Sequence, residues 1–413
     1  MRIQVPYGRE HVAVDVDEKN VSQIVHPNPV ESGDEKNIVQ HALNHPVNSE
    51  TFDQFIANAE DLLFIVNDAT RPTPTAKIID VIYDKIKNKN IKFIVATGIH
   101  RTPTEEEYEQ IFSTYYEVFR DRIYAHDCKN EELLVNLGKS KLGTEIKINK
   151  MIIAAHKIVI ITSVEPHYFA GYTGGRKSIM PGIAGYTTIE QNHRYALSPG
   201  ARALALEGNP VHEDMEDIVT RLNKEIFSVQ IVLDKNQNIY DATAGNLKSS
   251  FNVAVQKANE VFAVKVKEKA DIVVSVAPYP MDIDLYQSQK ALDNGKLALK
   301  DNGILILVSK CRSGAGDENF IRLMSSAGSP NKVMNKISKG YKLGWHKAAK
   351  MAEINLWAHV WAVTDLPDKV VRSIFIRPFH NLQQAIDEGI KEKGDTAKIL
   401  FLMEGSVTVP IIL

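Results

Sequence analysis

The residue types best suited to chemistry are concentrated between His167 and Leu197, in the sequence HYFAGYTGGRKSIMPGIAGYTTIEQNHRYAL. Its five glycines would let the backbone approach a ligand closely and expose amide groups, as anion-binding loops require. Arg176 and Lys177 add positive charge, so the segment predicts a site for a phosphate-bearing ligand. The segment is not a P-loop, because the upstream glycine at the required spacing is missing. A flexible turn before a helix is the alternative interpretation.

Lys177 lies inside this glycine-rich loop, among aromatic residues. A lysine that is removed from water can become a nucleophile and hold a cofactor covalently. Alternatively, Lys177 is a solvated point charge beside a phosphate. The residues alone leave both roles open.

His167 and His193 belong to the same segment but are 26 residues apart, too far for two metal ligands on one helix. If both line one pocket, the fold must bring them there. A single histidine is more often a hydrogen-bonded structural residue than a base or a ligand. We expect a structural role for His11, His26, His41, His45, His126, His156, His212, His346, His359 and His380.

The elements that could position these side chains read as a parallel sheet. The apolar run LLFIV at 62–66 predicts a strand, and the isoleucines between 78 and 86 recur at helical spacing after the loop NDATRPTPT. A second apolar run at 91–98 completes a strand–helix–strand unit, and 158–165 predicts a third strand.

Each of these three strands is followed by a polar loop. The loops carry Asp68 with Arg71, His100 with Arg101, and Glu165 with His167. In an open parallel sheet, ligands bind at the carboxyl ends of the strands, so we expect the three loops to converge on one crevice. Asp68 and Arg71 could form a surface salt bridge, or they could bind ribose hydroxyls and a substrate carboxylate respectively.

The strand–helix alternation restarts after about residue 265, with ADIVVSVAP, the helix YQSQKALDNGKLAL and the strand GILILVS. We therefore expect an α/β protein with two α/β domains, residues 1–265 and 266–413, each with a mostly parallel sheet. The last strand, at about 395–413, is a candidate to pack back on the first domain. Helices are expected over 251–269 and around 345–361.

The composition limits the possible partners. The chain has 413 residues, of which 44% are hydrophobic and 24% charged, as in ordinary globular proteins. The formal charge of -2 provides no basic field for nucleic acid or an anionic membrane. The N-terminal segment lacks an apolar signal region, which predicts a cytoplasmic protein. Cys128 and Cys311 are the only cysteines, so a metal would be held mainly by nitrogen and oxygen of the protein.

Five motifs, taken in order, have a more specific meaning. They are DATRPTPT (68–75), GIHRTPT (98–104), EPHYFAGYTGGRKSIMPG (165–182), NHR (192–194) and YQSQK (286–290). Each motif is weak by itself, but the ordered set resembles the nickel-pincer-nucleotide-dependent lactate racemase family. The resemblance extends from about residue 1 to about residue 400.

The resemblance implies an active site in a cleft between the two domains. It also implies a cofactor, Ni(II)-pyridinium-3,5-bisthiocarboxylate mononucleotide, covalently attached to Lys177. His193 matches the protein ligand of nickel, and the sulfur ligands come with the cofactor. Asp68 matches the residue expected to bond the cofactor ribose. The further cofactor contacts implied are Ala69, Thr70, Arg71, Gly174 and Gly175.

The implied activity is interconversion of D- and L-lactate by hydride transfer, through a pyruvate intermediate. His100 and His167 match the two histidines that alternate as acid and base. Arg71, Gln287 and Lys290 match residues near the substrate. Gln289 competes with Gln287, which we prefer because its spacing to Lys290 puts both on one helix face.

The resemblance leaves some matters open. Trp345 or Trp357 is a candidate to cover the cofactor, and the expected partners are the small 2-hydroxy acid and the enzymes of cofactor synthesis and nickel insertion. The substrate could be another 2-hydroxy acid, such as malate, an aryl-lactate or a sugar acid. Two other classes stay open: a non-catalytic nucleotide- or metal-binding protein, and a hydrolase with a conventional metal held by His167 and His193.

Overall fold

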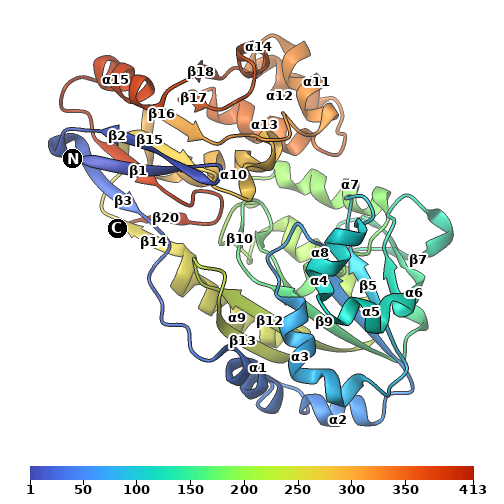
Figure 1. The fold of residues 1–413 in the computed structure, drawn as a ribbon. Coiled ribbons are helices and arrows are strands. Elements are labelled where there is room, and N and C mark those ends of the chain that lie inside the picture. The colour runs from blue at the N-terminus through green and yellow to red at the C-terminus, as the bar shows by residue number, and fades with distance from the viewer. The chain divides into compact units, whose positions relative to one another are not determined.

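The computed structural model describes all 413 residues, which divide into two compact units. The first unit comprises residues 29–261, and the second comprises residues 1–28 together with 262–413 (Figure 1). Each unit is built on its own six-stranded sheet with helices packed on it. No helix is both long and apolar enough to cross a bilayer.

The sheet of the first unit is parallel except for one edge strand. Its strands, in spatial order, are β13 (Ile239–Asn246), β12 (Glu225–Leu233), β9 (Lys157–Ser163), β4 (Leu62–Asn67), β5 (Ile91–Ala96) and β6 (Ile123–Ala125). The central strands read as unbroken apolar runs because both of their faces are buried.

One face of this sheet is covered by helices. Phe64 and Val66 of β4 and Phe93 of β5 point to that face and share a core with apolar side chains of five helices. These helices are α1 (Glu35–Asn44), α2 (Phe52–Ala57), α3 (Thr75–Ile86), α4 (Glu105–Phe112) and α5 (Tyr115–Phe119). The predicted strand–helix–strand unit is therefore confirmed as β4–α3–β5.

The remaining elements of the first unit are short hairpins and helices. The hairpins pair β7 (Leu134–Lys139) with β8 (Glu145–Asn149), and β10 (Pro166–His167) with β11 (Gly171–Tyr172). The helices are α6 (Lys150–Ala154), α7 (Tyr186–Arg194), α8 (Pro210–Thr220) and α9 (Leu247–Phe262), and a 3₁₀ turn spans Gly175–Ser178. That 3₁₀ turn packs against β4 and β9.

The sheet of the second unit is entirely parallel. Its strands, in spatial order, are β18 (Arg377–Phe379), β17 (His359–Val363), β16 (Leu299–Val308), β15 (Ala270–Val276), β19 (Ile399–Leu402) and β3 (Val21–Val25). A separate parallel pair joins β14 (Ala263–Val266) to β20 (Val409–Ile412).

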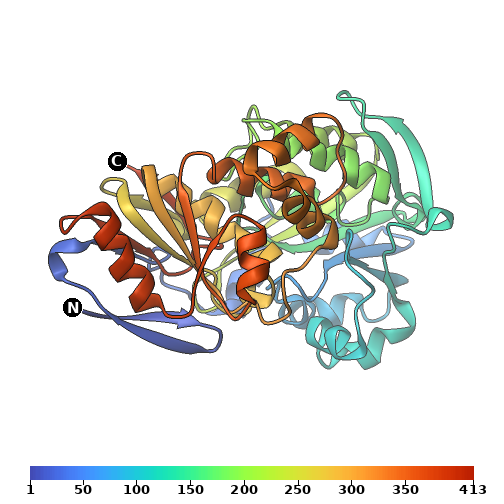
Figure 2. The same cartoon turned by 90° about the horizontal axis from the view of Figure 1, so that it is seen from above.

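Two different layers cover this second sheet. On one face, Leu305 and Leu307 of β16 pack with α10 (Leu285–Gly295), α11 (Glu318–Ala327), α12 (Pro330–Ser338), α13 (Trp345–Ile354) and α14 (Asp368–Ser373). On the other face, Ile304 and Ile306 pack with the hairpin of β1 (Arg2–Tyr7) and β2 (Glu10–Asp15) and with α15 (Leu382–Lys393). Figure 2 shows this dark-blue hairpin beside the red α15.

The compact units differ from the predicted domains at the N-terminus. Residues 1–28, expected in the first domain, belong to the second unit, where β3 forms an edge of the sheet beside β19. The last strand pairs inside the second unit as well, because β19 lies between β15 and β3. Two helix predictions are wrong in extent: α9 ends at Phe262, and α13 ends at Ile354, before Trp361 enters β17.

Candidate active site

Asp68, His100 and His167 follow the carboxyl ends of three adjacent strands, β4, β5 and β9. From β4 the chain proceeds to β5 and β6 on one side, whereas β9 and β12 are added on the other side. The strand order therefore reverses between β4 and β9. A crevice opens at such a reversal in α/β sheets, and ligands bind there.

Asp68 and His100 form the best-defined polar pair of this region. His100 Nδ1 lies 2.7 Å from Asp68 Oδ2, and the Thr70 hydroxyl donates to Asp68 Oδ1 at 2.7 Å. Asp68 is buried, whereas the His100 side chain is 35% exposed. Burial alone would raise the pKa of Asp68, but the bond and charge of His100, the Thr70 hydroxyl and the charge of Arg71 lower it below its usual value.

The pKa of Asp68 provides a test of this pair. In a His100→Gln variant we expect the pKa of Asp68 to rise, because the largest lowering contribution is lost while burial remains. Since the pKa is lowered in the folded protein, the stability from this pair is present above pH 3.8 and is lost as the pH falls through the folded value. A ¹³C NMR titration of the Asp68 carboxyl measures its pKa in the wild-type protein and in the variant. Thr70→Val should give a smaller rise, and an unchanged midpoint in His100→Gln would contradict the assignment.

Further hydrogen bonds tie the three loops together. The Thr73 hydroxyl, after β4, donates to Asn67 Oδ1 at 2.8 Å, and its oxygen lies within hydrogen-bond distance, 2.9 Å, of the Ser163 hydroxyl at the end of β9. The Gly98 amide, after β5, donates to the carbonyl of Gly182 in the glycine-rich segment at 2.9 Å. The predicted convergence of the three strand-end loops is thus observed.

The aromatic ring of Phe169 is the centre of the glycine-rich segment. His167 packs edge-on against it at 4.6 Å between ring centroids, and His193 does so at 5.1 Å. Lys177 Nζ lies 5.6 Å from the same ring centroid. Three of the predicted functional side chains therefore share one aromatic neighbour. Sequence reasoning missed Phe169, although its place in the EPHYFAGY motif was a usable signal.

His167 is buried at the start of a tight hairpin. Its Nδ1 accepts a 3.3 Å hydrogen bond from the amide of Ala170, and its ring stacks on Tyr168 at 5.0 Å. The hairpin pairs His167 with Gly171. Its own turn therefore contributes to holding the ring in place.

Gly174 and Gly175 have a packing role in addition to any contact with a ligand. Both adopt positive φ, +78° and +52°. A Cβ atom on Gly174 would lie 2.5 Å from Val164 Cγ2, and one on Gly175 would lie 2.9 Å from the ring of Phe251. The close backbone approach expected toward a ligand is therefore, at these two positions, an approach to the protein interior. Their contact with the cofactor stays a prediction.

Arg176 differs from the sequence-based expectation of a ligand-facing charge. Its side chain is almost completely buried, donates to the carbonyl oxygens of Ala170 (2.7 Å) and Gly174 (3.3 Å), and lies 4.5 Å over the Phe251 ring. Burial lowers the pKa of its guanidinium to about 10. Arg176 therefore stabilises the glycine-rich loop through hydrogen bonds to its backbone on the buried side, next to Lys177.

His193 lies on α7 and is partly buried. Burial, with a smaller contribution from the charge of Lys177, lowers its pKa from 6.5 to about 3. The imidazole is therefore neutral at pH 7, which is the form that binds a metal ion.

Residues 7–203 match the family model of the lactate racemase N-terminal domain, and residues 264–411 match that of the C-terminal domain. The lactate racemase of Thermoanaerobacterium thermosaccharolyticum is 31% identical over 98% of this chain and 97% of its own length.

The chain belongs to the lactate racemase family. It is therefore an isomerase of the racemase class. The lactate racemase of Lactiplantibacillus plantarum is 28% identical over 98% of both chains. The structure of the T. thermosaccharolyticum lactate racemase apoprotein superimposes with a TM-score of 0.92 at 30% identity, with 100% of both chains covered. A Thermotoga maritima protein shares the fold, with a TM-score of 0.70, 15% identity, and 93% of this chain and 100% of that chain covered.

The other predicted residues of this racemase-family chain lie in the second unit. Gln287 and Lys290 are partly exposed residues of α10. Gln289 is fully buried and donates to Asp293 Oδ2 at 2.7 Å, so its amide is engaged inside the core. This supports Gln287 over Gln289 as the substrate residue. Trp345 and Trp357 both pack against the helical core of this unit, and a covering role stays a prediction for either.

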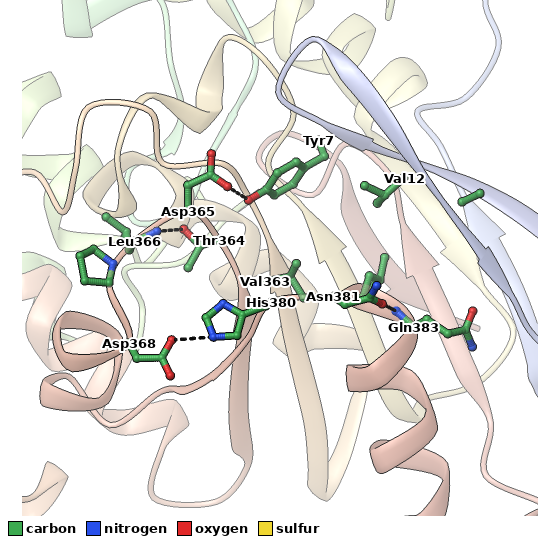
Figure 3. A pocket seen from close by; sticks show the side chains of 13 residues that line it. Tyr7, Val12, Val363, Thr364, Asp365, Leu366, Asp368, His380, Asn381 and Gln383 are labelled. Atoms are coloured by element: carbon green, nitrogen blue, oxygen red, sulfur yellow. Dashed lines mark hydrogen bonds and ion pairs between the residues drawn. The ribbon is translucent and has the colours of Figure 1, made fainter.

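A separate pocket of about 550 Å³ lies in the second unit at the carboxyl ends of β17 and β18 (Figure 3). The Tyr7 hydroxyl donates there to Asp365, and His380 Nε2 lies 3.3 Å from Asp368 Oδ1. None of the predicted site residues lines this pocket. We therefore assign it no part in the candidate active site.

Proposed function

We propose that the chain interconverts D- and L-lactate with a nickel-pincer nucleotide attached to Lys177 and with His193 as the protein ligand of nickel. The observation that carries this proposal is the shared environment of His167, Lys177 and His193 around Phe169. The paired Asp68 and His100 lie on the adjoining strand-end loops. The names of the two lactate racemases that match nearly the whole chain support lactate as the substrate.

The residues fit such a cofactor. Lys177 is only 9% exposed and lies by an aromatic ring, so little water surrounds its amine. His193 would offer a neutral imidazole to the nickel, and imidazole is a ligand that suits this metal. When bound, the cofactor supplies an acceptor that takes a hydride from the substrate carbon and returns it. Asp68, Ala69, Thr70, Arg71, Gly174 and Gly175 are the further cofactor contacts we propose.

His100 is suited to the role of base. Its Nδ1 donates to the ionised Asp68, which leaves Nε2 as the basic nitrogen, and the carboxylate stabilises the imidazolium that forms. In one direction of the reaction, His100 takes the proton of the substrate hydroxyl, and the substrate passes through pyruvate. Asp68 thus serves orientation as well as the predicted contact with ribose.

His167 would serve the opposite enantiomer. The hydrogen bond from the Ala170 amide occupies Nδ1, so in this arrangement the ring proton is on Nε2, which can donate to a substrate oxygen. To act as a base, His167 must release that contact and move its proton to Nδ1. A length of 3.3 Å lies beyond the usual range for hydrogen bonds from an amide, so this bond is weak.

Arg71 is the proposed anchor of the substrate carboxylate, because guanidinium binds carboxylate through two parallel hydrogen bonds. Gln287 and Lys290 are proposed as further substrate contacts. The proposed partners are the small 2-hydroxy acid and the enzymes that make the cofactor and insert nickel.

The direct test uses cofactor-loaded protein and single enantiomers of lactate, malate, an aryl-lactate and a sugar acid. Chiral chromatography follows inversion, and intact mass reports the adduct. We expect inversion of lactate in both directions. Faster inversion of another acid would reassign the substrate within the same chemistry, whereas no inversion of any acid by adduct-bearing protein would overturn the proposal. Protein from a host without the cofactor pathway is the control, expected to be unmodified and inactive.

A further inference from the structure

Helix α7, which carries His193, is held along one face by polar contacts. The amide of Lys147 donates to the hydroxyl of Thr188 at 2.9 Å, and the amide of Glu145 donates to Gln191 Oε1 at 2.7 Å. The Tyr195 hydroxyl, just beyond the helix, donates to the carbonyl of Leu142 at 2.8 Å. These contacts and Asn192 recur with the period of a helix, at 188, 191, 192 and 195. The β7–β8 hairpin is thus bound to α7 and to Tyr195 by hydrogen bonds.

Asp214 on α8 is the centre of this arrangement. Its Oδ1 accepts from the Ser140 hydroxyl at 2.5 Å, and its Oδ2 accepts from the Thr144 hydroxyl at 2.8 Å and from Asn192 Nδ2 at 2.9 Å. Asn192 also donates to the carbonyl of Val211 at 3.2 Å. Asp214 and Asn192 are both completely buried. One carboxylate therefore joins the hairpin, α7 and α8.

A buried carboxylate is a costly way to join three elements. Its removal from water is unfavourable, and the three donors are neutral groups. Apolar side chains of similar volume would often hold such elements as well or better. Unlike apolar contacts, the hydrogen bonds of the carboxylate are directional. They fix the rotation of α7 about its own axis as well as the distance between α7 and α8.

We propose that Asp214 is a positioning residue for His193, acting through Asn192. This inference rests on the proposed function, in which His193 binds nickel. Asn192 is the immediate neighbour of His193, so a fixed Asn192 fixes the direction in which the imidazole leaves the helix. At the ~5–6 Å outer radius of a helix, a rotation of about 10° displaces a side-chain tip by roughly 1 Å. Metal–ligand distances tolerate only about 0.2 Å.

The test compares Asp214→Asn with a matched control, Asp217→Asn. Asp217 lies on the same helix and accepts from the amide of Lys141 in the same hairpin at 2.7 Å, and its hydrogen bonds link it to that hairpin and to Arg221. Asn192→Ser is the second variant, and it replaces Asp214→Asn if that protein does not fold. It removes the hydrogen bond between residue 192 and Asp214 but leaves Asp214 bonded to the hydroxyls of Ser140 and Thr144. His193→Ala is the reference for loss of the ligand.

Two measurements are made on each variant. In protein without cofactor, hydrogen exchange of the segment 186–195 reports the mobility of α7. In adduct-bearing protein, the rate of nickel loss to a chelator is measured while intact mass confirms that the Lys177 adduct remains. We expect faster exchange in α7 and nickel loss faster by about 10–100-fold in Asp214→Asn and Asn192→Ser, as for other groups that orient metal ligands. Asp217→Asn should change neither.

The outcomes separate the two proposals. If His193→Ala does not accelerate nickel loss, His193 is not the ligand and the proposed function fails at this residue. If His193→Ala accelerates nickel loss but Asp214→Asn and Asn192→Ser do not, the positioning role is rejected and the proposed function stands. An equal effect of Asp217→Asn would also reject it, because the cause would then be general loosening of α8.

Discussion

Lys177→Ala is expected to abolish racemisation, lowering activity by roughly 10⁴-fold or more. The reason is that Lys177 is the proposed covalent attachment point, and it is the only lysine between His167 and Leu197. The measurement pairs chiral chromatography of the product with intact mass of protein from a cofactor-producing host. The mass should equal that of the unmodified variant.

The control for this experiment is Lys257→Ala. Lys257 is a surface residue paired with Glu260 on α9, so its loss should leave both adduct and activity unchanged. Lys177→Arg keeps a positive charge in the loop but offers no amine for the same attachment, and it should behave as Lys177→Ala does. An adduct of unchanged mass on either Lys177 variant would place the attachment elsewhere.

His100→Ala and His167→Ala are each expected to reduce racemisation by about 10²–10⁴-fold, the usual contribution of a positioned acid or base. The adduct should remain in both variants, because neither residue takes part in attachment. The rate of conversion of D- to L-lactate and the rate of the reverse conversion should decrease by the same factor. Since the equilibrium constant between enantiomers is one, kcat/KM must be equal for D- and L-lactate in any variant.

The measurement is initial velocity from each pure enantiomer, alongside intact mass. His126→Ala is a poor comparison, because His126 is buried and bonded to the carbonyl of Ala184. His380→Ala is better, because His380 is a mostly exposed residue of the second unit, and activity should be unchanged. Normal turnover in either His100→Ala or His167→Ala would reject the scheme with two bases.

Much of the fold could be predicted from local patterns. The runs LLFIV and IKFIVATG are buried on both faces in β4 and β5, and the isoleucines of α3 face the sheet as their spacing requires. These patterns are readable because each reflects burial of one element against whatever covers it. The strand-end positions of Asp68, His100 and His167 follow from the same reading, since a parallel sheet puts all carboxyl ends at one edge.

Contacts between distant segments could not be read in this way. The strand β3 is only partly buried and pairs with β19, more than 370 residues later in the chain, so nothing in its own pattern indicates its partner. For the same reason the sequence of residues 1–28 does not show which compact unit they join. The hydrophobic period of a strand shows which of its faces is buried. Its partner strand depends instead on which sheet edge still has unpaired backbone groups when the chain folds.

Five ordered motifs in the amino-acid sequence are enough to indicate the family, and with it the residue types available for chemistry. How these residues are held is visible only in the folded chain: Asp68 is bonded to His100, three of the predicted site residues surround Phe169, and Arg176 points inward and bonds to the backbone of the loop. A motif specifies neighbours along the chain, whereas the pKa, the burial and the orientation of a side chain depend on its neighbours in space. Asp214, with no motif to mark it, is the clearest example.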